Sequence, residues 1–180
     1  AHSSLLKSAA AVLLLLLAAA FFCTAAAAAT DIYDEAALRE AVSVPDFDVK
    51  LCADIKLTNF RMAGKDNSLV IPNTGIQNHQ GTIDLNGHTL LYAGLPSRQS
   101  GDNNGAVIIL KPGTTLIIDD TSEAKTGKIT GGTGTHTLMN YGENYLFGGG
   151  VYVSDAAHLI LNGGSISENR IDDSSKIDAA

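Results

Sequence analysis

The feature that most constrains the fold is a short motif that recurs three times: an apolar strand, a bend at Asn or Asp, and a second strand. The copies are Thr82-Ile83-Asp84-Leu85-Asn86-Gly87-His88, Thr115-Leu116-Ile117-Ile118-Asp119-Asp120 and His158-Leu159-Ile160-Leu161-Asn162-Gly163-Gly164. A second strand follows at residues 89–91, 128–130 and 165–167, after an insertion of residues 121–126 in the middle copy. Asn, Asp and Gly enter the left-handed backbone region more easily than other residues. The repeat therefore predicts strands joined by sharp bends.

Other short segments rich in Ile, Leu, Val and Thr extend this pattern over most of the chain. Strands are predicted at residues 49–53, 55–58, 68–71, 82–85, 89–92, 106–110, 115–118, 128–130, 151–153, 158–161 and 165–167. The run 107–110, turn, 115–118 matches the run 151–153, turn, 158–161, which gives three short strands per unit. Such a unit cannot bury its own interior and must stack on its neighbours. We therefore expect an all-β fold, a right-handed parallel β-helix whose coils occupy residues 46–180. A β-sandwich is the competing fold, but its strands usually run longer and are joined as hairpins.

One short helix is predicted before the strands, at residues 31–43. Asp34 is a suitable N-cap, because its carboxylate can accept hydrogen bonds from the first free N–H groups of a helix. Ala37, Leu38, Ala41 and Val42 recur at helical spacing and form one apolar face, and Pro45 stops the helix. An uncovered end of a β-helix exposes apolar interior and unpaired backbone groups. We expect residues 30–45 to cap that end.

Residues 1–29 differ from the rest of the chain and are predicted to be a cleavable apolar leader. Lys7 precedes a continuous apolar run over residues 9–22, and the small-residue tract Ala27-Ala28-Ala29 provides a cleavage site of the A-x-A kind. The mature chain would then begin near Thr30. An uncleaved membrane anchor is one alternative, because the apolar stretch is just long enough to span a bilayer. Lipid attachment at Cys23 is another.

The charge balance argues against one class of partner. The formal net charge is −7, and removal of the leader leaves 11 basic residues against 19 acidic ones. Such an acidic domain repels phosphate backbones, so nucleic acid is not expected as a partner. The histidines show no metal-binding spacing. We predict no metal site and no organic cofactor, and contact with a membrane only through an uncleaved leader.

The order of these motifs resembles the start of bacterial pectin-lyase-like surface proteins. The resemblance is carried by the helix with Ala37-Leu38 and Ala41-Val42, by Val49-Lys50-Leu51-Cys52-Ala53-Asp54-Ile55-Lys56-Leu57, and by Ile83-Asp84-Leu85-Asn86-Gly87-His88-Thr89-Leu90. Later, Gly148-Gly149-Gly150-Val151-Tyr152-Val153 and Gly163-Gly164-Ser165-Ile166-Ser167-Glu168-Asn169 are similar to repeats of adhesin-like passengers of polymorphic outer-membrane proteins. The resemblance implies a β-helix capped by a helix and a place outside the cell. It does not imply a particular reaction.

Acidic residues near the bends and aromatic residues in a long interruption are the two kinds of residue that could form a functional site. The acidic pairs Asp119-Asp120 and Asp172-Asp173 are interpreted as turn residues, because neighbouring strand residues face opposite sides, and Asp84 is expected to point outward without a partner. No catalytic residue is assigned. The segment 133–147 interrupts the coils and contains Tyr141, Tyr145 and Phe147. Exposed aromatic rings can stack on sugars, so these three are the candidate ligand-binding residues, although packing of the loop against the β-helix is the preferred interpretation of the same residues.

These observations lead to one functional expectation and one alternative. We expect a secreted or cell-surface β-helix protein without catalysis, adhesin-like or glycan-binding, with an extracellular glycan or a host surface as partner. The alternative is the N-terminal part of a polysaccharide lyase or glycosidase whose active coils lie beyond residue 180. The absence of a second capping pattern near residue 180 also predicts that more coils follow.

Overall fold

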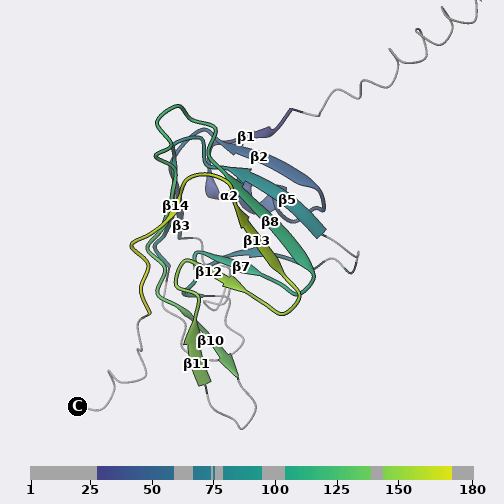
Figure 1. Ribbon diagram of the computed structural model, residues 1–180, viewed down its shortest axis with the longest axis vertical. Coiled ribbons are helices and arrows are strands. Elements are labelled where there is room, and N and C mark those ends of the chain that lie inside the picture. The colour runs from purple at the N-terminus through teal and green to yellow at the C-terminus, as the bar shows by residue number, and fades with distance from the viewer. Residues whose placement is uncertain are drawn as a thin grey trace, which may run out of the picture.

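The chain passes repeatedly through three parallel β-sheets, from which one antiparallel hairpin projects (Figure 1). The computed structural model describes residues 28–58, 67–73, 75, 79–94, 104–138 and 144–171. The first sheet has the order β1 (Thr30–Ile32), β2 (Phe47–Leu51), β5 (His79–Asp84), β8 (Thr114–Asp119) and β13 (His158–Leu161). The second has the order β3 (Ile55–Leu57), β6 (Thr89–Tyr92), β9 (Lys128–Thr130) and β14 (Ser165–Ile166). The third has the order β4 (Leu69–Ile71), β7 (Ile108–Leu110) and β12 (Val151–Val153).

The chain visits these sheets in a repeating order. It runs from β2 in the first sheet to β3 in the second and β4 in the third, and then returns to the first sheet with β5. One such pass is called a circuit. The second circuit is β5, β6 and β7, the third is β8, β9 and β12, and β13 and β14 begin the fourth. The predicted all-β class with three short strands per unit is confirmed, and the parallel pairing of successive circuits is compatible with a β-helix.

The core is made of side chains that stack in columns from one circuit to the next. Alternate residues of a strand face opposite sides, so strands such as β2, β6 and β8 bury every second residue. Ile83 pairs with Ile118, and Ile118 pairs with Leu161, so these three aliphatic side chains form one column. Ile83 and Ile118 are fully buried. Continuous columns of this kind join all the circuits into a single hydrophobic core.

The strand pairing corrects the sequence alignment of the first copy of the repeat. His158 pairs with Thr115, as the alignment of the second and third copies predicts. Thr82, however, pairs with Ile117, and Asp84 pairs with Asp119, so the first copy is shifted by two residues from its predicted position. A shift of two residues keeps every side chain on the same face of its strand. The apolar pattern alone could not distinguish the two registers.

The predicted helix forms, but it is shorter than expected. Helix α2 spans Glu35–Ala41, and the Asp34 carboxylate accepts a 2.8 Å hydrogen bond from the Ala37 N–H, which confirms the N-cap. Residues 31 and 32, predicted to be helical, instead belong to β1, because their backbone groups pair with β2. The apolar face is as predicted: Leu38 and Val42 enter the core, and the helix packs against β1, β2 and β3.

One polar side chain of α2 fastens it to a distant part of the chain. The Arg39 guanidinium forms an ion pair with Glu35 and donates hydrogen bonds to the backbone carbonyl oxygens of Asn67 and Ser68, at 2.7 and 2.8 Å. Asn67 and Ser68 lie immediately before β4, at the start of the third sheet's first strand. The helix is therefore fixed to the first circuit on both its apolar and its polar side.

One hairpin was not predicted from the sequence, and some predicted segments lie outside the described residues. The hairpin of β10 (Thr135–Leu138) and β11 (Asn144–Phe147) lies between β9 and β12 and extends away from the three sheets (Figure 1). The predicted leader lies outside the described residues except for Ala28 and Ala29, as does the acidic pair Asp172-Asp173. No helix among the described residues is long and apolar enough to cross a membrane.

Candidate functional site

The acidic residues at the bend after β5 and β8 are engaged in hydrogen bonds with the backbone. Asp84 lies on the strand face opposite to the buried Ile83, as expected, but contrary to expectation it is almost completely buried and has partners. Its carboxylate accepts hydrogen bonds from the backbone N–H of Asn86, and from both the N–H and the hydroxyl of Thr121. The expectation was wrong because Thr121 lies in the insertion of the next circuit, which the strand pattern does not place.

Asp120 is the centre of this polar cluster and is fully buried. One carboxylate oxygen accepts hydrogen bonds from the Gly87 N–H at 2.8 Å, the Ser122 hydroxyl at 2.7 Å and the Ser122 N–H at 3.2 Å. The other accepts a 2.7 Å bond from the Gly127 N–H. Burial by itself would raise the pKa of Asp120, but the hydrogen bonds from Ser122, Gly127 and Gly87 outweigh it and lower the pKa.

These hydrogen bonds hold the bends together, and they engage both carboxylate oxygens of Asp120. The Asp120 carboxylate joins the bend after β5 to the bend after β8, because Gly87 and Gly127 belong to different circuits. Asp119, interpreted from the sequence as a turn residue, is the last residue of β8, and its carboxylate accepts a hydrogen bond from the Asp120 N–H. Within the part of the chain that the structure describes, no group of three or more His, Cys, Asp or Glu residues could hold a metal ion.

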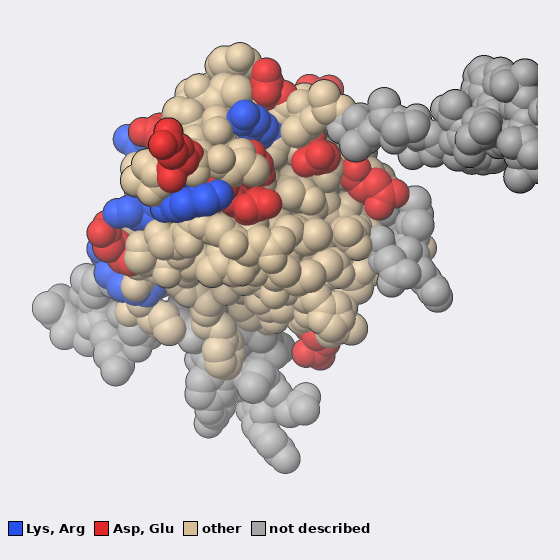
Figure 2. Space-filling view, turned by 45° about the horizontal axis from the view of Figure 1, so that its top comes forward, with Lys and Arg blue, Asp and Glu red and all other residues tan. Residues whose placement is uncertain are grey.

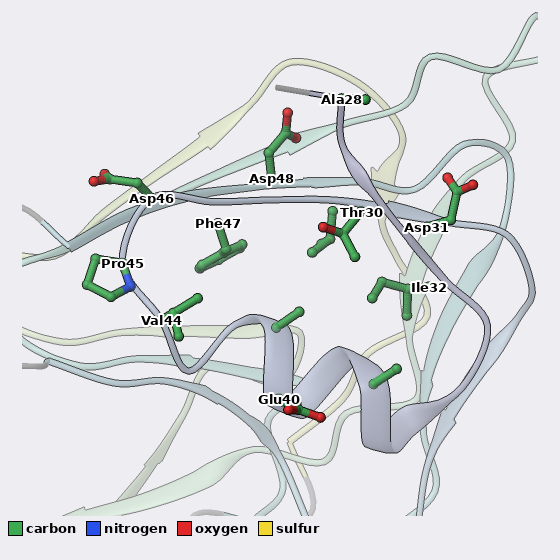
Figure 3. Close-up of a pocket in the computed structure, with 13 residues that line it drawn as sticks. Ala28, Thr30, Asp31, Ile32, Glu40, Val44, Pro45, Asp46, Phe47 and Asp48 are labelled. Carbon is green, nitrogen blue, oxygen red and sulfur yellow. The ribbon is translucent and has the colours of Figure 1, made fainter. Parts of the chain in front are cut away.

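A cleft of about 480 Å³ lies between α2 and the strands β1 and β2 (Figure 3). Its floor is apolar and includes Ile32, Phe47 and Val49, all of which belong to the hydrophobic core. Val44 and Pro45, in the connection between α2 and β2, form one side of the cleft. In Figure 3 the Phe47 ring and the Ile32 side chain lie between the strands and the helix.

The rim of the cleft is acidic. Asp31, Glu40, Asp46 and Asp48 line it, and the carboxylates of Asp31 and Asp48 point away from the helix in Figure 3. None of the residues that line the cleft is Lys or Arg. Figure 2 shows Asp and Glu side chains gathered on the side from which the first described residues emerge, with most Lys and Arg on another side. Such a cleft suits an apolar group that carries a positive charge. No sequence pattern predicts this cleft, because its residues come from the helix, two strands and a connection.

The structure places two of the three predicted ligand-binding aromatics on the hairpin. Tyr145 belongs to β11, where it pairs with Thr137, and Phe147 ends the same strand opposite Thr135. Phe147 is 37% exposed. Tyr141 lies outside the described residues. Tyr145 and Phe147 are therefore two positions apart on one strand.

Comparison with known proteins gives no match, whether to a protein family, to an individual characterised protein or to a solved structure. The resemblance to pectin-lyase-like surface proteins is therefore supported only at the level of its parallel β-sheets.

Proposed function

We propose that this chain is an exported, right-handed parallel β-helix that acts as a non-catalytic scaffold and binds an extracellular glycan or a host surface through the hairpin β10–β11. The repeated passage through three parallel sheets supports the coil, and α2 packed on the first strands supports the cap. A right-handed course is expected because connections between parallel strands of one sheet have this hand in nearly all proteins.

Export is supported by the position of the first described strand. The first described strand starts at Thr30, the residue that follows the predicted cleavage site Ala27-Ala28-Ala29. Ala28 and Thr30 are exposed, so a peptidase could reach this segment. Cleavage there would leave every described strand intact. Mass spectrometry of the purified protein tests this proposal: a mature N-terminus at Thr30 supports it, whereas retention of residues 1–29 would indicate an anchor.

The observation that carries the binding proposal is the projecting hairpin itself. Three sheets of stacked strands form a rigid base, and the hairpin leaves that base at the end of β9 and returns to it at β12 (Figure 1). Binding residues often lie on excursions of this kind, held by a rigid scaffold. Phe147 is an exposed aromatic residue at the end of β11, and Tyr145 lies two positions before it in the same strand; aromatic residues suit stacking on the apolar faces of sugar rings.

A glycan array containing neutral and acidic oligosaccharides tests the proposal. Because the protein is acidic, binding is expected to neutral glycans and to be weaker for polyanionic ones. Tyr145→Ala and Phe147→Ala should each weaken binding by roughly tenfold, since one stacking contact is lost. Tyr33→Ala is the matched control, because Tyr33 is 65% exposed and lies beside β1, in a different element.

The same glycans distinguish a binder from an enzyme. A scaffold should release no new reducing ends and no unsaturated sugars on prolonged incubation. Release of such products would favour the polysaccharide lyase or glycosidase alternative. Binding that is unchanged in both hairpin variants would refute the hairpin as the contact surface.

A further inference from the structure

The cleft beside α2 has an apolar interior that small side chains leave open. The helix contributes Ala37 and Ala41, which lie one turn apart and whose side chains are methyl groups. The strand β2 contributes the buried side chains of Phe47 and Val49. Val44, in the connection between α2 and β2, also lines the cleft, and it is 53% exposed although it is apolar. An apolar group that entered the cleft would therefore cover apolar surface that water contacts.

The size of the cleft suits a small molecule. Its volume of about 480 Å³ lies within the range of roughly 300–1,000 Å³ that small-molecule sites occupy. An alkyl chain or an aromatic ring of roughly six carbon atoms fits well inside such a space.

The charges around the cleft select a cation. Asp31, Glu40, Asp46 and Asp48 line it, and within the described part of the chain none of these four carboxylates forms an ion pair. Lys50 lies beside Asp31 in the register of β1 and β2, but it does not line the cleft. Four carboxylates against one nearby ammonium group leave the mouth of the cleft negative, so it attracts cations and repels anions.

The geometry separates the apolar interior from the charged mouth. Because successive residues of a strand face opposite sides, the exposed Asp48 faces away from the buried Phe47 and Val49. In Figure 3 the Phe47 ring lies between the helix and the strands, whereas the Asp48 carboxylate points away from the helix. A charged group at the mouth stays in contact with water, so its desolvation costs little.

We propose that this cleft binds a small primary ammonium ion that carries an alkyl or aryl group of roughly six carbon atoms. The apolar group lies between Ala41 on the helix and Phe47 on the strand, and the ammonium group lies at the mouth, near Asp48. Alcohols and carboxylates with the same apolar group match the interior of the cleft but not its rim. The site is separate from the hairpin β10–β11, so this proposal does not depend on glycan binding there.

Nuclear magnetic resonance titration of the isotope-labelled protein with n-hexylammonium tests the proposal. The compound should bind and shift the amide signals of α2 and β2. The alcohol n-hexanol should bind about fivefold more weakly, because the contact between exposed charges is lost, and hexanoate should not bind measurably. Raising the salt concentration to about 1 M should remove most of the difference between n-hexylammonium and n-hexanol, because charges are then screened within about 3 Å.

Two substitutions locate the ligand, and each has a matched control. Ala41→Leu should abolish the binding of both compounds, because the larger side chain fills the cleft, whereas Ala36→Leu changes an exposed residue of the same helix that does not line it. Asp48→Asn should weaken the binding of n-hexylammonium about threefold and leave that of n-hexanol unchanged. Asp155→Asn removes an exposed carboxylate from the connection between β12 and β13 and should change neither.

Several results would overturn the proposal. Equal affinities for n-hexylammonium and n-hexanol at low salt would show that the rim does not select a cation, and no binding of either would show that the cleft is not a site. Binding that Ala41→Leu leaves intact would place the ligand elsewhere. Binding that appears only after removal of residues 1–29 would assign the cleft to the chain's own N-terminal residues. Circular dichroism shows whether each variant is folded, and if Ala41→Leu is not, the Asp48→Asn comparison still decides.

Discussion

The Asp120 carboxylate provides the most direct test of how the circuits are held together. Replacing Asp120 with Ala removes four hydrogen bonds, and three of their donors are backbone N–H groups, those of Gly87, Ser122 and Gly127. The Gly127 N–H is buried, whereas the bonds to Gly87 and Ser122 are only partly buried, so water can replace the carboxylate at those two.

The expected cost follows from these contacts. A buried donor left without an acceptor costs about 1–3 kcal/mol, and hydrogen bonds to a charged group contribute about 1.5–3 kcal/mol each. Part of this loss is offset because the carboxylate no longer has to be removed from water. We therefore expect Asp120→Ala to lower the free energy of unfolding by about 3 kcal/mol, which for a domain of this size lowers the melting temperature by about 10 °C.

Urea unfolding followed by far-ultraviolet circular dichroism measures this difference. Asp119→Ala is the control, because it removes the same charge from the neighbouring residue but only one hydrogen bond, to the Asp120 N–H. Its cost should be about 1 kcal/mol or less. Asp120→Asn should lower the free energy of unfolding by an intermediate amount. Its single amide oxygen can accept hydrogen bonds from the donors of only one of the two carboxylate oxygens. Equal losses in the two alanine variants would refute the view that Asp120 joins the bends.

Three further predictions concern the core and its pH dependence. Ile118→Ala should cost about 3–4 kcal/mol in urea unfolding and Ile117→Ala about 1 kcal/mol, because only Ile118 is fully buried; equal costs would contradict the assigned faces. Gly132→Ala should abolish the soluble fold, judged by yield and circular dichroism, because its Cβ would lie 1.6 Å from the Gly149 carbonyl oxygen. Burial lowers the pKa of His79 below its ordinary 6.5, so the unfolded chain takes up a proton first as the pH falls. Stability should therefore decline below about pH 6.5, and His79→Gln should reduce this decline; an unchanged pH profile would exclude His79 as the cause.

The stabilisation that Asp120 provides should also depend on pH, but at acidic pH below the ordinary pKa of a carboxyl group. Because its hydrogen bonds hold its pKa below the ordinary 3.8, the stabilisation it provides is fully present above that pH and is lost as the pH falls further. This loss lies at lower pH than the decline attributed to His79, so the two can be separated in one titration. The lower step should be absent from Asp120→Ala.

Much of the secondary structure could be predicted because it depends on local pattern. The strands β6, β9, β12 and β13 have the boundaries that the sequence indicates, since each is a short apolar segment bounded by turn residues. The Asp34 N-cap and the apolar face of α2 could also be predicted from the sequence. The strand β1 was not predicted because the helix was expected to begin at residue 31 and so included two of the three residues of β1.

The candidate sites depended on tertiary structure. Asp84 and Asp120 each accept hydrogen bonds from residues of another circuit. The spacing of residues in the sequence does not predict such contacts. The cleft beside α2 is assembled from the helix, two strands and a connection. The hairpin aromatics were recognised as residues of an interruption, but their place on an antiparallel strand was not.

The sequence by itself determined the class of fold, the positions of the bends and the face of each strand, because alternation and bend residues act within a few positions of the chain. Only the tertiary structure decided the register between circuits and the burial of each apolar residue. Ile118 and Leu161 occupy equivalent positions of the repeat, yet one is fully buried and the other is 48% exposed. The difference arises because burial depends on whether another strand stacks above a residue. The amino-acid sequence of the residue's own strand does not determine whether that neighbouring strand is present.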